Sequence, residues 1–95
     1  MNKTKSWIEK KLENPKFKKK FMNETYKLSI AEQLIKARLE AGLTQAKLAK
    51  KIGTTASAIS RYENVHYEKY EVNTIRKIVE ACGRELQITI SKPAA

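Results

Sequence analysis

The stretch GLTQAKLAKKIGTTASAISRYEN, from Gly42 to Asn64, has the residue pattern of a helix-turn-helix. It predicts a short helix over Thr44 to Lys51, a tight turn at Gly53, and a second helix that opens at Thr55. Four apolar residues fall where two short helices crossing at a wide angle pack together: Leu48, Ala49, Ile52 and Ile59. Such a pair presents its second helix to the major groove of DNA. DNA binding is therefore the leading functional hypothesis.

The chain has 95 residues, which is enough for one small domain with a single core. Its hydrophobic content of 41% suits a globular protein, so global disorder is not expected. One cysteine excludes an internal disulfide, and no apolar run approaches the ~20 residues that a membrane span needs. A cytoplasmic protein is the expectation.

The net charge of +10 is unevenly distributed. Residues 1–27 carry an excess of +6, residues 28–63 an excess of +3, and residues 64–95 an excess of +1. A basic excess favours a polyanionic partner, because neutralising phosphates releases condensed counterions. A merely soluble, lysine-rich surface is the alternative explanation of the charge.

The N-terminal part of the chain is expected to form two short helices rich in lysine. Ser6 and Glu9 have the spacing of a capping box, which predicts a helix of about two turns after Ser6. Pro15 follows an asparagine and suits the first position of a second helix. In that helix Phe17 and Phe21 recur at i and i+4, so one face is apolar and lysines surround it.

Stronger helix signals begin at Ser29. Ser29 and Glu32 form a second capping box, and Gly42 is placed to end that helix in a left-handed conformation. After the helix-turn-helix, a further helix is expected over Val72 to Ala81, with Gly83 at its end. The domain from Ser29 onward therefore looks complete without the N-terminal part.

Residues 85–91 alternate strictly between polar and apolar, which predicts a β-strand. A lone strand cannot satisfy its backbone groups or hide its apolar side, and the chain offers no second strand. We therefore expect this strand to pair with its copy in a second subunit, through Leu86, Ile88 and Ile90. Three parts are predicted in all: an N-terminal basic helical arm (1–28), a helix-turn-helix DNA-binding domain (29–84), and a C-terminal strand and tail (85–95).

Residue types and spacing agree with a known family at many positions together: Arg38, Gly42 to Gln45, Leu48, Ala49, Gly53, Ala58 to Arg61, and Glu63. On these positions the segment 30–83 resembles the Xre/Cro type of phage and bacterial repressor domain. The resemblance implies an all-α, lambda-repressor-like bundle, here with an N-terminal arm and a C-terminal dimerising strand. With its extensions, the whole chain is most similar to the HigA-type antitoxins, which commonly pair as dimers.

The resemblance implies a DNA-binding role for seven residues: Thr44, Gln45, Thr55, Ala56, Ser57, Ser60 and Arg61. Gln45 matches a residue that hydrogen-bonds a phosphate, although a solvated helix-start residue is the simpler reading. Thr55 is expected to cap the second helix, while Ala56 offers a base only a methyl contact. Arg61 is the strongest candidate for a specific contact with guanine, and a phosphate contact is its rival.

A structural role is expected for four further residues or pairs. By the resemblance, Arg38 and Glu63 form a partly buried ion pair that ties the first domain helix to the end of the recognition helix. Cys82 matches a core aliphatic position, so it is expected to be a buried apolar residue. His66 has no ligand cluster nearby, and no metal, cofactor or catalytic residue is expected.

The apolar residues of the arm are expected to form a partner-docking surface: Trp7, Ile8, Leu12, Phe17 and Phe21. The first hypothesis is accordingly a transcriptional repressor that is also the antitoxin of a type II toxin–antitoxin pair, with operator DNA, a second copy and a small ribonuclease toxin as partners. The alternative is a stand-alone Xre-family regulator whose arm adds DNA contacts. A third is an interaction module for RNA or an acidic protein. An enzyme is the weakest option.

Overall fold

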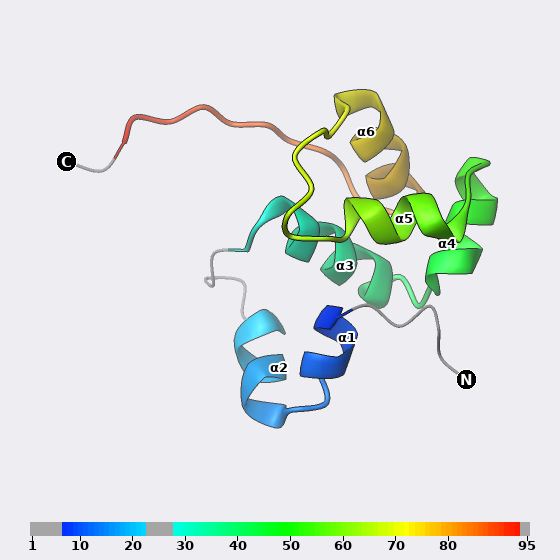
Figure 1. Ribbon diagram of the computed structural model, residues 1–95. Coiled ribbons are helices and arrows are strands. Elements are labelled where there is room, and N and C mark those ends of the chain that lie inside the picture. Colours follow the sequence, from blue (N-terminus) through cyan, green and yellow to red (C-terminus); the bar gives the residue numbers. More distant parts are fainter. Residues whose placement is uncertain (1–6, 23–27, 94–95) are drawn as a thin grey trace.

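The computed structural model describes residues 7–22 and 28–93, and in these ranges the protein is helical (Figure 1). Six helices follow one another: α1 (Trp7–Lys11), α2 (Pro15–Met22), α3 (Ile30–Glu40), α4 (Gln45–Ile52), α5 (Ala56–Tyr62) and α6 (Val72–Ala81). No helix in the described part of the chain is both long and apolar enough to cross a membrane. The capping box proposed at Ser6 lies outside the described residues.

The helix ends in the central part of the chain follow from local side-chain chemistry. Ser29 caps α3 as half of a capping box, since its hydroxyl accepts from the Glu32 amide and the Glu32 carboxylate accepts from the Ser29 amide. Thr44 and Thr55 cap α4 and α5 in the same way, each accepting from the amide three residues ahead. Gly53 then ends α4 in the left-handed region with φ 76°, which turns the chain into α5.

The main core lies between α3, α4, α5 and α6. Leu34 of α3, Leu48 and Ala49 of α4, and Ile59 of α5 are almost fully buried in one cluster. The α6 helix adds three core residues: Ile75, Ile78 and Val79. This arrangement packs α4 against α5 at the helix-turn-helix and closes the bundle with α6 (Figure 1).

A second, smaller core joins the arm to α3. Phe21 of α2 and Ile35 of α3 are both 0% exposed and lie in one cluster. Three further apolar residues of α1, α2 and the segment between them and α3 pack against it: Leu12, Phe17 and Met22. The arm therefore covers a face of α3 that would otherwise expose Ile35, which corrects the expectation that the domain is complete from Ser29.

The expected β-strand over residues 85–91 is absent from the described structure. The segment is extended, and no backbone–backbone hydrogen bond of the described chain involves it. The physical reason is that a single described chain offers these residues no neighbouring strand. Leu86 packs against the main core, whereas Ile88 and Ile90 are 65% and 96% exposed.

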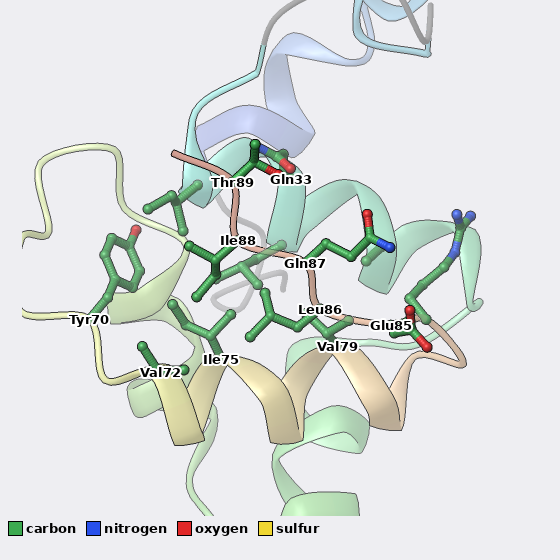
Figure 2. A pocket seen from close by; sticks show the side chains of 14 residues that line it. Gln33, Tyr70, Val72, Ile75, Val79, Glu85, Leu86, Gln87, Ile88 and Thr89 are labelled. Atoms are coloured by element: carbon green, nitrogen blue, oxygen red, sulfur yellow. The ribbon is translucent and has the colours of Figure 1, made fainter. Parts of the chain in front are cut away.

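The C-terminal segment forms one wall of an apolar groove of about 810 Å³. The other walls come from α3 and α6, including Ile30, Val72 and Ile75. Figure 2 shows Leu86 and Ile88 on the segment, facing the same space as Ile75 of α6. Ile30 and Val72 are each 48% exposed at this groove, so its apolar lining is only partly covered.

Candidate nucleic-acid interface

The outward face of α5 is short and polar. Ser57, Ser60 and Arg61 are exposed, while Ile59 and Tyr62 on the opposite side are buried in the core. Ala56 and Ala58, between them, are partly buried and leave the polar face uncovered. Hydroxyl and guanidinium groups on one exposed helix face are suited to base edges and phosphates in a major groove.

The beginnings of α4 and α5 each place an exposed threonine beside this face. Both hydroxyls are occupied as caps: Thr44 Oγ1 accepts from Lys47 N at 3.0 Å, and Thr55 Oγ1 accepts from Ala58 N at 3.1 Å. A threonine hydroxyl that accepts through one lone pair still has a proton to donate. The structure therefore gives both residues their capping role and leaves them exposed for a phosphate contact.

Gln45 lies elsewhere than a solvated or freely exposed helix-start residue would. It is 3% exposed, and its Nε2 donates to Glu63 Oε1 at 2.9 Å. The physical reason is the carboxylate of Glu63, which brings a buried acceptor to the start of α4. Gln45 thus joins the beginning of α4 to the end of α5, and a phosphate contact from it stays a prediction.

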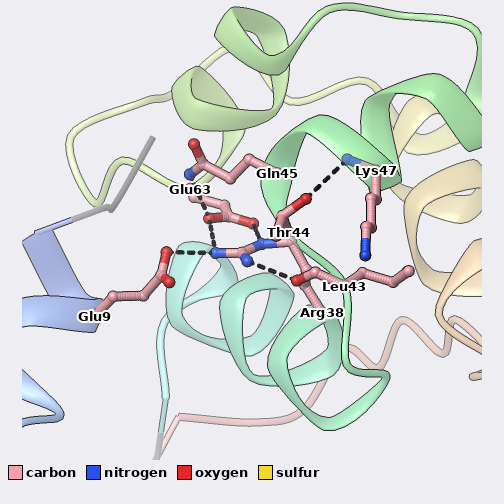
Figure 3. A network of polar contacts seen from close by, with 7 residues as sticks. All are labelled: Glu9, Arg38, Leu43, Thr44, Gln45, Lys47 and Glu63. Atoms are coloured by element: carbon pink, nitrogen blue, oxygen red, sulfur yellow. Dashed lines mark hydrogen bonds and ion pairs between the residues drawn. The ribbon is translucent and has the colours of Figure 1, made fainter. Parts of the chain in front are cut away.

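Arg38 is the centre of the polar network that holds these helix ends together (Figure 3). The expected ion pair with Glu63 is present and bidentate: Nε donates to Oε2 at 2.7 Å and a terminal nitrogen to Oε1 at 2.9 Å. The other terminal nitrogen donates to the carbonyl oxygen of Leu43 at 2.9 Å. One contact was not expected from the sequence, a hydrogen bond at 2.8 Å from Arg38 to the carboxylate of Glu9 in α1.

The network lies away from solvent, with Arg38 1% and Glu63 2% exposed. Burial alone would lower the pKa of Arg38, but the hydrogen bonds and charges of Glu63 and Glu9 outweigh it and raise that pKa above its ordinary value. The guanidinium is therefore permanently charged, and no buried side-chain polar atom in the described residues lacks a partner. Arg38 consequently fixes α1, α3, the start of α4 and the end of α5 relative to one another.

Three tyrosines support the loop after α5. The rings of Tyr62, Tyr67 and Tyr70 contact one another at centroid distances of 5.0 to 5.2 Å, and the Tyr70 hydroxyl donates to the Tyr62 carbonyl oxygen. Burial raises the pKa of Tyr67, while the positive charge of Arg61 opposes this rise, which places Arg61 close to Tyr67. Sequence reasoning missed Tyr67 as a neighbour of the interface, although the recurring tyrosines were a visible signal.

The apolar residues of the arm are only partly where a docking surface requires them. Phe21 is 0% exposed against α3, which corrects its assignment to an exposed partner-docking surface. Leu12 and Phe17 are partly buried in the same cluster, with the Phe17 and Phe21 rings stacked at 6.0 Å. The side chains of Trp7 and Ile8 lie outside the described part of the structure.

Cys82 and His66 have the surroundings of structural residues. Cys82 is 7% exposed in the main core, and burial raises the pKa of its thiol, which keeps it protonated. His66 is exposed, and its backbone amide donates to Asn64 Oδ1. The described residues contain no group of three histidine, cysteine or acidic side chains that could hold a metal ion.

The fold and its exposed α5 face together define a helix-turn-helix DNA-binding protein. A model of the helix-turn-helix family matches residues 34–88, more than half of the chain, and the protein belongs to that family. Membership places it among DNA-binding transcription regulators. The match leaves out α1 and α2, so it does not support the more specific likeness to HigA-type antitoxins. No curated protein and no solved structure matches the chain.

Proposed function

We propose that the protein is a dimeric, sequence-specific transcriptional repressor that inserts α5 into the major groove of its operator. The observation that carries this proposal is the exposed polar face of α5, formed by Ser57, Ser60 and Arg61, on a helix whose two ends are fixed. Thr55 caps its beginning, and the Arg38 network holds Glu63 at its end. A rigidly held helix keeps its side chains in register with base edges, which sequence-specific contacts require.

The C-terminal segment supports a two-fold dimer. Residues 85–91 are extended and have no backbone partner in the described chain, so they offer a free edge for β-pairing. Antiparallel pairing with the same segment of a second copy satisfies that edge and covers Ile88 and Ile90. In such a dimer the two α5 helices meet half-sites roughly 34 Å apart, one turn of DNA.

An antitoxin role is the less well supported alternative. It needs a surface on the arm to which a ribonuclease toxin can dock, and the largest buried apolar side chain of the arm, Phe21, packs instead against Ile35. The arm then offers chiefly charged side chains to a partner. The stand-alone regulator, in a cytoplasmic setting with operator DNA as its partner, agrees better with this geometry.

Arg61→Ala tests the proposal. Duplexes selected from a random pool by the wild-type protein supply the operator, and fluorescence anisotropy then measures affinity for the selected and for unrelated DNA. Loss of a bidentate guanine contact is expected to weaken operator binding by roughly 1–3 kcal/mol and to relax preference at one base pair. Arg76→Ala, at an exposed arginine of α6, is the matched control. Equal weakening on both kinds of DNA would show that Arg61 contacts only phosphate.

A further inference from the structure

The exposed side of α2 is the most strongly charged surface of the described chain that α5 does not explain. Its eight residues include four lysines and no acidic residue. All four are exposed: Lys16, Lys18, Lys19 and Lys20. Phe17 and Phe21 occupy the side that faces α3, so the helix presents its charge outward and its apolar side inward.

The arm that carries these lysines is fixed to the domain at two points. Phe21 is fully buried beside Ile35, and Glu9 accepts a hydrogen bond from Arg38 at 2.8 Å. A helix held in this way places its charges at a fixed distance from α5, and it leaves little apolar surface for a protein partner. What the arm offers to a ligand is therefore charge without a deep pocket or an apolar anchor.

The attachment of α1 also locates the arm. Arg38, which holds Glu9, contacts Glu63 at the end of α5, and Glu63 in turn accepts from Gln45 at the start of α4. Figure 3 shows Glu9 entering this network from the side, next to the two helix ends. The arm thus borders the elements that face the DNA, at the edge where the duplex backbone continues beyond the bases read by α5.

We propose that the lysine face of α2, formed by Lys16, Lys18, Lys19 and Lys20, binds phosphates of the duplex that flank the half-site. This inference rests on the proposed function, since it needs α5 to place the duplex. Lysine ammonium groups are flexible point charges that bind phosphate without demanding one geometry. Each phosphate neutralised releases counterions, so this contact adds affinity and salt dependence without sequence preference.

The test compares K18Q/K19Q with R76Q/K77Q, which removes the same charge from exposed positions of α6. Each protein is titrated over a range of salt concentrations with two operator duplexes, one limited to the two half-sites and one about ten base pairs longer at each end. On the long duplex, K18Q/K19Q is expected to lower the slope of log affinity against log salt by about 1.8, which is 0.9 for each lost phosphate contact. On the short duplex the slope is expected to change little. R76Q/K77Q is expected to match wild type on both.

An unchanged slope for K18Q/K19Q on the long duplex overturns the inference, and so does an equal loss with R76Q/K77Q. If K18Q/K19Q weakens binding to a single-stranded RNA of equal length more than binding to duplex DNA, the surface is an RNA site instead. Circular dichroism of both variants must match wild type, since all four positions are exposed. Failure of the proposed function is distinguished by Arg61→Ala: if that variant keeps full sequence preference, α5 is not the reading helix, whatever the lysines do.

Discussion

Phe21 is the residue through which the arm enters the core, so Phe21→Ala is expected to destabilise the protein strongly. Its side chain is 0% exposed and lies with Ile35 in the second core. A buried phenylalanine removes roughly 150–250 Å² from water, which at about 25 cal/mol per Å² corresponds to about 4–6 kcal/mol. Truncations of this kind in measured cores lower the free energy of unfolding by about 3–5 kcal/mol, and we expect the same range here.

Urea unfolding followed by circular dichroism measures this change, and thermal unfolding provides a second reading. In a domain of this size 1 kcal/mol shifts Tm by about 4–8 °C, so a fall of at least about 12 °C is expected. Phe17→Ala is the matched control, because Phe17 belongs to the same helix and cluster but is only partly buried. Its loss of stability is expected to be clearly smaller. Fluorescence of Trp7, in α1, reports separately on the arm.

The reasoning is refuted if Phe21→Ala unfolds within about 0.5 kcal/mol of wild type, the range of an ordinary surface substitution. In that case α2 would contribute nothing to the stability of α3, and the domain from Ser29 onward would be complete by itself. A loss of Trp7 signal without a change in overall unfolding would lead to the same conclusion, because the arm would then detach at no cost to the rest.

Two further predictions concern the dimer and the buried network. Ile88→Asp is expected to turn a dimer into a monomer by light scattering, because a charge would be placed in the paired strand; a wild-type protein that is already monomeric at micromolar concentration contradicts the dimer. Glu63→Gln is expected to lower the free energy of unfolding by about 3–5 kcal/mol, because it removes the bidentate carboxylate from a buried guanidinium. Glu40→Gln, which breaks the exposed pair with Arg84, is expected to change it by less than about 1 kcal/mol. Equal effects of the two glutamate variants would show that the network does not hold the fold.

The helix ends were determined by the sequence. Ser29 and Thr55 cap their helices through hydrogen bonds that span three residues, and Gly42 and Gly53 adopt positive φ where the helices stop. Contacts of this length depend only on neighbouring residues, so the order of residue types is enough to predict them. The helix Val72–Ala81 followed in the same way from its apolar spacing.

The role of the arm was decided only by the tertiary structure. Phe21 and Ile35 are fourteen positions apart, and Glu9 and Arg38 are twenty-nine apart, so no local pattern links either pair. An amphipathic helix shows in its sequence that it has an apolar face, but not whether its own domain or another protein covers that face.

The same limit explains Gln45 and the C-terminal segment. Gln45 looked like a polar helix-start residue, and its burial follows from Glu63, eighteen positions away, which supplies an acceptor inside the network. Residues 85–91 alternate as a strand does, yet the backbone of an extended segment is satisfied only by a second strand. Sequence therefore determined the helices and their caps. Which faces meet, which polar groups pair and what covers the last extended segment depend on elements brought together in space.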